Sequence, residues 1–207
     1  GGVGGGAYGT LLISNSTVRA NTSYGAGGGV YLSGGSVAAT RIDGNAVLGS
    51  ANGGGCCAYA GEAIRGCVIV NNVCPSGGGG VYGATLYDCL LTNNTAQSGG
   101  GYAYDTSSRS LYRCRLSGNR AAASGGGASY GTLVNCVVSG NSAGSGGGGT
   151  YFSALEHCTV VGNEAANGGG VYAATAYNSV IYYNRANLNA EYAYSTIVRG
   201  CTTPFEE

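Results

Sequence analysis

The side chains in this sequence that could do chemistry are, first of all, nine cysteines. Five of them stand at the same place in successive copies of a short pattern, and the outer copies have Ser or Thr there. A position that accepts Cys, Ser and Thr selects small side chains, and free Cys behaves as a small buried hydrophobe. We therefore expect a buried column of reduced thiols, made of Cys67, Cys89, Cys114, Cys136 and Cys158, with Ser16, Thr40, Ser179 and Thr196 as its outer members.

Disulfide and metal sites are the alternatives for these cysteines. Side chains stacked at the strand spacing of ~4.8 Å are farther apart than the ~3.8 Å that joins Cβ atoms across a disulfide. The sequence also has no CxxC pair and no histidine cluster beside the cysteines, so metal-ligand spacing is missing. Adjacent Cys56 and Cys57 should open a strand with one side chain inward and one outward. We expect no metal or cofactor, and the outward thiol of this pair to react first or to pair with another chain.

Catalytic residues are not indicated. His157 is the single histidine and follows Glu156, but neighbours in a strand point to opposite faces, and Ser153 is not in a nucleophile elbow. A polysaccharide-cleaving site needs several carboxylates close together, whereas almost every repeat here has one. Asp88 and Arg113 occupy the same place in neighbouring repeats, which predicts a surface ion pair. We expect a protein that is not an enzyme.

Composition limits the elements that can carry these residues. The chain has 207 residues, with 43 Gly, 2 Pro, 43% hydrophobic residues and 9% charged residues. Gly costs about 1 kcal/mol relative to Ala inside a helix, which argues against helices. The hydrophobic content argues against disorder. Zero formal charge argues against nucleic acid or an anionic membrane as a partner. The sequence has no run of 18 apolar residues, so it does not predict a membrane-spanning helix.

Internal repeats determine the predicted architecture. Glycine runs recur every 21 to 26 residues, ending for example at Gly55, Gly80 and Gly101. Between the runs stands aliphatic-x-x-(Cys/Ser/Thr)-x-aliphatic-x-x-Asn, as in residues 133–141. Both aliphatic positions should face a core. The asparagines should stack and hydrogen-bond from coil to coil; they are Asn21, Asn45, Asn72, Asn94, Asn119, Asn141, Asn163 and Asn184.

A period near 22 with short β-branched segments and glycine-rich corners is typical of a solenoid whose equivalent positions stack at the strand spacing. The prediction is an all-β fold, a right-handed, single-stranded parallel β-helix of about nine coils. It forms one domain over residues 1–207, with an atypical last coil and tail from residue 185 to residue 207. Leucine-rich repeats share the period but need more Leu per copy and a longer convex segment.

The motifs resemble those of a known group of proteins. Copies of (Val/Ile/Leu)-x-x-Asn, preceded by Gly-Gly-Gly-(Val/Ala)-Tyr, are similar to the repeats of polymorphic outer-membrane proteins and of β-helical autotransporter passengers. The resemblance covers residues 4 to about 200. It implies a β-helix outside the cell, in a group that includes adhesins, surface fibres and some enzymes. An aliphatic residue stands where that group has Phe.

The outward positions beside the cysteine column suggest a contact surface. They form an apolar series on successive coils, and exposed apolar strips of this kind mark interaction sites. The alternative is that a flanking segment covers them. The candidate contact residues are Val68, Val70, Leu90, Val137, Val161, Val180, Tyr182 and Ile197.

Tyrosines form two further columns. One follows the glycine runs, and the other precedes the cysteine column. Stacked rings can hold adjacent coils together or bind sugar rings. The first column contains Tyr8, Tyr31, Tyr82, Tyr151 and Tyr172, and the second contains Tyr87, Tyr112, Tyr177 and Tyr194.

These features predict a non-enzymatic structural or adhesive module, extracellular or on the cell surface. The sequence shows no polar capping segment at either end, which favours self-association into a fibre or filament by end-to-end stacking, with the apolar series as a lateral contact. The alternative is a carbohydrate-active β-helix, either a lyase or a module that binds surface glycans through its tyrosines.

Overall fold

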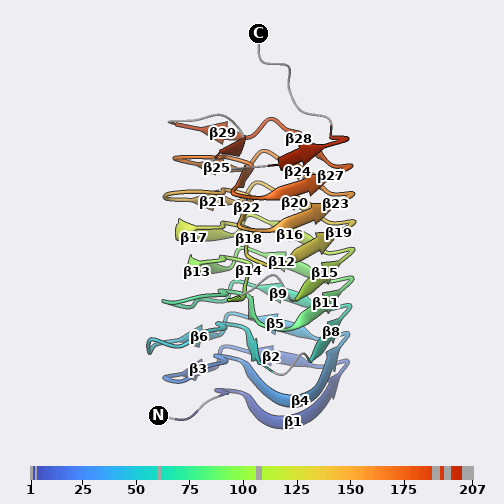
Figure 1. Cartoon of the computed structure of the whole chain (residues 1–207). Helices are drawn as coiled ribbons and strands as arrows, with labels where there is room; N and C mark the ends of the chain where they lie inside the picture. The colour runs from blue at the N-terminus through green and yellow to red at the C-terminus, as the bar shows by residue number, and fades with distance from the viewer. Residues whose placement is uncertain are drawn as a thin grey trace.

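The computed structural model describes residues 2, 4–59, 62–105, 109–187, 192–193 and 197–201. Every regular element in these residues is a β-strand. They contain no helix long and apolar enough to cross a membrane. The strands pair in parallel with their equivalents in the next turn, so the chain winds into a stack of flat coils (Figure 1).

The predicted all-β parallel β-helix is confirmed, and it has about eight turns. One sheet has a single strand from each of eight successive turns. Its eight strands are β2 (Thr17–Arg19), β5 (Arg41–Asp43), β9 (Val68–Val70), β12 (Leu90–Thr92), β16 (Arg115–Ser117), β20 (Val137–Ser139), β24 (Thr159–Val161) and β28 (Val180–Tyr182). We call this sheet B.

The largest sheet has sixteen strands and begins with two long ones, β1 (Ala7–Ser14) and β4 (Val30–Ala38). The first half of β4 pairs with β7 (Cys56–Ala58), and its second half pairs with β8 (Ala63–Arg65). From there the sheet continues as two rows of short strands. Row A1 contains β7, β10 (Val81–Tyr82), β14 (Tyr102–Ala103), β18 (Ala128–Ser129), β22 (Thr150–Tyr151), β26 (Val171–Tyr172) and β30 (Tyr192–Ala193).

Row A2 and a smaller sheet complete the coil. Row A2 contains β8, β11 (Thr85–Tyr87), β15 (Ser110–Tyr112), β19 (Thr132–Val134), β23 (Ala154–Glu156), β27 (Thr175–Tyr177) and β31 (Ile197–Arg199). Sheet C contains β13 (Thr95–Ser98), β17 (Arg120–Ser124), β21 (Ser142–Ala143), β25 (Glu164–Ala165) and β29 (Arg185–Ala186). In the first turns β3 (Thr22–Ser23) and β6 (Ala46–Val47) form a separate pair.

The core is built from the two aliphatic columns of the repeat. In row A2, Leu86, Leu111 and Leu133 lie in register, and they are fully buried. Leu91 and Leu116 do the same in sheet B. Burying a side chain of this size contributes about 1.5–3 kcal/mol, and the contribution is repeated in every turn.

The glycine runs form the corner that leads into row A1. Gly53 has a φ of +76°, a left-handed conformation that glycine adopts without steric cost. A Cβ atom on Gly54 would lie 2.6 Å from the carbonyl oxygen of Val73, so the backbones of adjacent turns approach too closely for any side chain. The N–H of Gly54 donates to the carbonyl of Gly78 at 3.0 Å. Glycine therefore recurs because turns stack here backbone against backbone.

Candidate functional site

The cysteine column marks a sharp corner between row A2 and sheet B. Each member donates a hydrogen bond to the backbone carbonyl two residues earlier. The Cys136 thiol donates to Val134 at 3.4 Å, and the Ser179 hydroxyl donates to Tyr177 at 2.8 Å. The residue between is left-handed, as at Asn135 with a φ of 54°. Cys, Ser and Thr share this position because each has a donor attached to Cβ.

The thiols also link adjacent turns. The Cys136 thiol lies 3.3 Å from the carbonyl oxygen of Leu111 in the preceding turn, and its sulfur accepts the N–H of Cys114 at 3.4 Å. Each thiol is thus held by backbone groups from more than one turn. The five predicted cysteines lie in this column, and none of the nine cysteines forms a disulfide.

Cys201 continues the column, which corrects the register expected for the last turn. Its thiol donates to Arg199 at 3.3 Å, and its sulfur accepts the N–H of Ser179 at 3.3 Å. Thr196, the expected member, lies outside the described residues. The signal was present in the sequence, since residues 198–201 repeat the aliphatic-x-x-Cys pattern.

The environment of the column keeps most of its thiols protonated. The hydrogen bond with Cys136, followed by burial, raises the pKa of Cys114 to about 12. The hydrogen bond with Cys114 likewise raises the pKa of Cys89 to about 12. At Cys158 the hydrogen bond from Cys136 lowers the thiol pKa instead. Because the thiolate is the reactive form, Cys89 and Cys114 are poor nucleophiles and poor metal ligands at neutral pH.

Cys56 and Cys57 do point to opposite faces, but neither is exposed. Cys56 lies in the main core, whereas Cys57 lies in a second cluster with Ala26, Tyr82 and Ala103. Both side chains are fully buried, and burial raises the pKa of Cys57 to about 12. The expectation of an accessible outward thiol was wrong, because tyrosines cover this side of row A1.

The asparagine column runs inside the corner between sheets B and C. Nδ2 of Asn119 donates to Oδ1 of Asn141 at 3.0 Å, and Nδ2 of Asn141 donates to Oδ1 of Asn163 at 2.9 Å. Nδ2 of Asn141 also donates to the carbonyl of Leu116 in the preceding turn at 3.0 Å. The same bonds link the other predicted members, from Asn21 to Asn184. All the members are buried except Asn21, which is half-buried.

The predicted apolar series lies on the outer face of sheet B but is interrupted. In one column Arg115 separates Leu90 from Val137, and Thr159 separates Val137 from Val180. In the other column three polar residues, Thr92, Ser117 and Ser139, lie between Val70 and Val161. Val70 is only 7% exposed, while Val180 is 41% exposed. Val68 pairs with Leu90, and Tyr182 pairs with Val161.

Ile197 does not belong to this face. It pairs with Thr175 of β27 in row A2, not with a strand of sheet B. The correction follows from the register of the last turn, in which Cys201 rather than Thr196 takes the corner position.

The second tyrosine column is partly built as predicted. The rings of Tyr87 and Tyr112 stack at 5.1 Å with an interplanar angle of 12°, and Arg65 lies 3.8 Å above Tyr87. Tyr177 is 41% exposed, and Tyr194 lies outside the described residues.

The first tyrosine column is interrupted at two places, and the first is Cys57 between Tyr31 and Tyr82. Tyr8 stacks on Tyr31 at 5.3 Å, and Tyr151 stacks on Tyr172 at 5.2 Å. Between Tyr82 and Tyr151 the column contains Ala103 and Ser129 instead. The missing rings leave a groove in row A1.

Titratable side chains on the surface form mostly single pairs, and Asp43 contacts both Arg41 at 3.1 Å and Arg19 at 3.8 Å. Arg113 donates to Asp88 at 2.7 Å with both side chains more than half exposed, as expected of a surface pair. His157 lies 3.9 Å from Glu156, and both are also more than half exposed. Within the described ranges, no group of three or more His, Cys, Asp or Glu residues could hold a metal ion.

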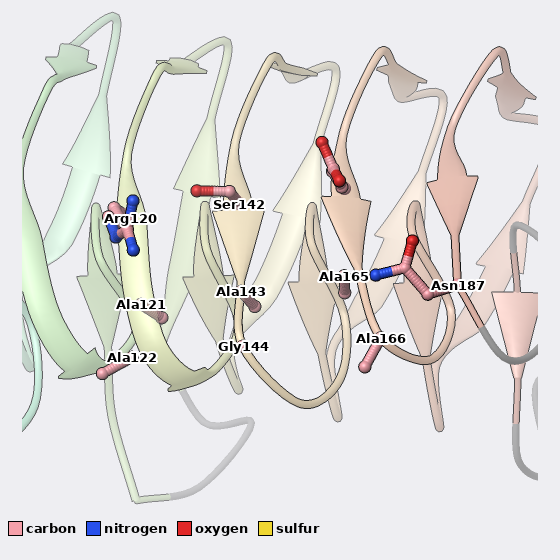
Figure 2. Close-up of a pocket in the computed structure, with 10 residues that line it drawn as sticks. Arg120, Ala121, Ala122, Ser142, Ala143, Gly144, Ala165, Ala166 and Asn187 are labelled. Atoms are coloured by element: carbon pink, nitrogen blue, oxygen red, sulfur yellow. The ribbon is translucent and has the colours of Figure 1, made fainter.

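A shallow hollow crosses the outer face of sheet C. Figure 2 shows Arg120, Ala143, Ala165 and Asn187 on four successive turns around it. Its volume is about 420 Å³. Alanines provide much of its lining, and Glu164 pairs with Arg185 beside it at 3.4 Å. The hollow follows from the small side chains of the turns and brings no reactive groups together.

Comparison with known proteins identifies the fold family. No curated protein matches the chain. The family model described as "Periplasmic copper-binding protein (NosD)" matches residues 12–200, which is most of the sequence. This is a family of right-handed β-helix repeats, in agreement with the stacked turns described above. The chain belongs to the NosD family of β-helix repeat proteins.

Proposed function

We propose that this chain is a non-enzymatic structural module outside the cytoplasm, which presents its side faces for contact and associates with other copies of itself. The regular turn-to-turn pairing supports a rigid scaffold, because every turn is held by both backbone and side-chain hydrogen bonds. The periplasmic description of the family supports the location. An adhesive or fibre-forming role at the surface is the more specific form of this proposal.

The observation that carries self-association is an apolar patch on β24 and β28. Val161 and Tyr182 lie in register and are half-buried, and Val180 beside them is 41% exposed. The ring of Tyr183, 76% exposed, packs edge-on against Tyr182 at 4.3 Å. Large exposed apolar side chains gathered in this way favour a protein contact. We call these four residues the β28 patch. Axial stacking is the other arrangement, and it would reuse the parallel pairing that joins β1 to β4.

The copper binding named for the family finds no matching donor set among the described residues. The chain has no Met and one His, and that His lies on an exposed corner beside a single carboxylate. The thiols, which are the soft ligands that favour Cu(I), are directed at backbone carbonyls within the core. The residues present do not fit a copper site, and the proposed function uses none.

Sedimentation velocity and light scattering across a range of concentrations test the proposal. The unmodified chain should form species larger than a monomer as concentration rises. The double variant Val180→Lys/Tyr182→Lys should shift this equilibrium toward monomer by about tenfold or more, because two charges would be buried in the contact. Thr17→Lys, an exposed position on the same sheet far from the patch, is the matched control.

A monodisperse monomer at every concentration would contradict self-association. If assembly persists in the double variant, the β28 patch does not form the contact. Electron microscopy would then show whether copies stack along the axis.

A further inference from the structure

Row A1 contains a groove at the place where its tyrosine column is interrupted. In register along the row stand Tyr82, Ala103, Ser129 and Tyr151. Ala103 and Ser129 are almost fully buried, at 4% and 5% exposed, and form the floor. The groove has a volume of about 630 Å³. That volume lies within the range of about 300–1,000 Å³ common for small-molecule sites.

Aromatic rings form both ends of this groove. At one end Tyr82 meets Tyr104 with ring centroids 5.7 Å apart and an interplanar angle of 62°. At the other end Tyr130 meets Tyr151 at 6.3 Å and 88°. Two turns lie between Tyr82 and Tyr151, which places their backbones about 14 Å apart at the parallel-strand spacing. The groove therefore offers ring faces and edges with an open length between them.

The remaining lining is polar and mostly uncharged. It includes the amides Asn52 and Gln97, the hydroxyls of Ser98 and Ser124, and the carboxylate Asp105. Among the described residues that line the groove there is no Lys or Arg. Arg109 lies outside this lining, over the ring of Tyr104 at 5.4 Å from its centroid. A phosphate or an acidic sugar would therefore meet the Asp105 carboxylate with no cation in the lining itself. A ligand rich in hydroxyl groups would find both donors and acceptors.

Hydrogen bonds hold the groove in shape. The Asn52 side chain accepts the N–H of Gly77 at 3.0 Å, and the N–H of Tyr104 donates to the carbonyl of Ser129 at 3.2 Å. The Tyr82 hydroxyl is hydrogen-bonded to Asp105, and the Tyr82 ring is only 4% exposed. A site held this way before binding loses little conformational entropy when a ligand enters.

We propose that this groove binds a short stretch of neutral carbohydrate. The apolar faces of sugar rings would pack against Tyr104, Tyr130 and Tyr151, while Asp105 and the serine and amide groups accept and donate hydrogen bonds to the sugar hydroxyls. The groove lies in row A1, whereas the β28 patch lies on sheet B. Carbohydrate binding is therefore independent of self-association.

Isothermal titration calorimetry of the whole chain with soluble neutral oligosaccharides of glucose, mannose and N-acetylglucosamine tests the proposal, with oligogalacturonate as the anionic comparison. At least one neutral oligosaccharide should bind, and oligogalacturonate should bind more weakly. Ser129→Tyr places a ring beside Tyr151 on the floor of the groove and fills part of its volume, so it should weaken binding by about tenfold or more. Val134→Tyr adds a ring to the column of Tyr112 in row A2, outside the groove, and should bind like the unmodified chain.

Far-UV circular dichroism and thermal melting establish that each variant is folded. If Ser129→Tyr does not fold, Tyr104→Ala and Asp105→Asn replace it, since both change groove side chains while leaving the floor intact. The proposal is overturned if no neutral oligosaccharide binds at millimolar concentration, if oligogalacturonate binds more tightly, or if the groove variants bind as well as the unmodified chain. None of these outcomes depends on the oligomeric state.

Discussion

Cys136 shows why a single position accepts Cys, Ser and Thr. Its single S–H is shared between the carbonyl oxygens of Val134 and Leu111, and its sulfur accepts the N–H of Cys114. Ser179 makes two of these contacts with a hydroxyl: it donates to the carbonyl of Tyr177 at 2.8 Å and accepts the N–H of Cys158 at 3.0 Å. The requirement at this corner is a short side chain with one donor and one acceptor, and sulfur chemistry is secondary.

Two substitutions at Cys136 separate these roles. Cys136→Ser keeps the donor and acceptor and should change the free energy of unfolding by less than about 1 kcal/mol, whereas Cys136→Ala leaves the N–H and carbonyls without this partner and should cost about 1–3 kcal/mol. Urea denaturation followed by circular dichroism measures both. Equal losses in the two variants would mean that volume, not hydrogen bonding, decides the residue at this corner.

Asn141 is representative of the central asparagines, whose polar bonds link three successive turns. Its Oδ1 accepts both the backbone N–H and the Nδ2 of Asn119, at 2.9 Å and 3.0 Å, and its Nδ2 donates to Leu116 and Asn163. Asn141→Leu should lower the free energy of unfolding by about 2–4 kcal/mol, because buried neighbours lose partners on both sides. Asn187→Leu, at an exposed position, is the control. If Asn141→Leu leaves the melting temperature unchanged, the hydrogen bonds of the asparagine column do not stabilise the fold.

At the scale of elements, the corner between row A2 and sheet B determines how each turn bends. His157 occupies the left-handed position of this corner with a φ of 53°, where residues with a Cβ atom are strained. His157→Gly should therefore stabilise the chain by about 0.5–1 kcal/mol after the greater unfolded-state entropy of glycine is included. Urea denaturation at neutral pH measures the effect. Thr159→Gly, in the adjacent strand β24, is the control and should lower the free energy of unfolding. If His157→Gly lowers it as well, the His157 side chain stabilises the corner.

The whole molecule behaves as a stack in which each turn contacts only its neighbours. Its polar bonds run inside the corners, and its aliphatic columns fill the space between the sheets. The outer faces are consequently free to vary without changing the fold, and they differ from side to side. Sheet B carries the β28 patch, row A1 carries the tyrosine groove, and sheet C carries a shallow hollow lined largely by alanine. In such a molecule the side chains on the outer faces determine what it can bind.

The sequence alone determined the parallel β-helix and the inward columns. In a solenoid each residue packs on the residue one period away, so a repeated spacing in the chain is also a contact in space. That is why Leu111, Cys136 and Asn141 could be assigned to the interior from their places in the repeat. The last copy has an atypical spacing, so its pattern fits Thr196 as well as Cys201, and Cys201 takes the corner position.

Only the tertiary structure decided what the outer faces present. Strand alternation predicts that Cys57 points outward, but rings from neighbouring turns cover it, and a pattern along one strand does not report such cover. The same limit applies to the groove, which exists because Ala103 and Ser129 are small where Tyr82 and Tyr151 are large. Burial by neighbours and the shape of a surface depend on side chains from several turns at once, whereas the repeat specifies only which backbone positions lie side by side.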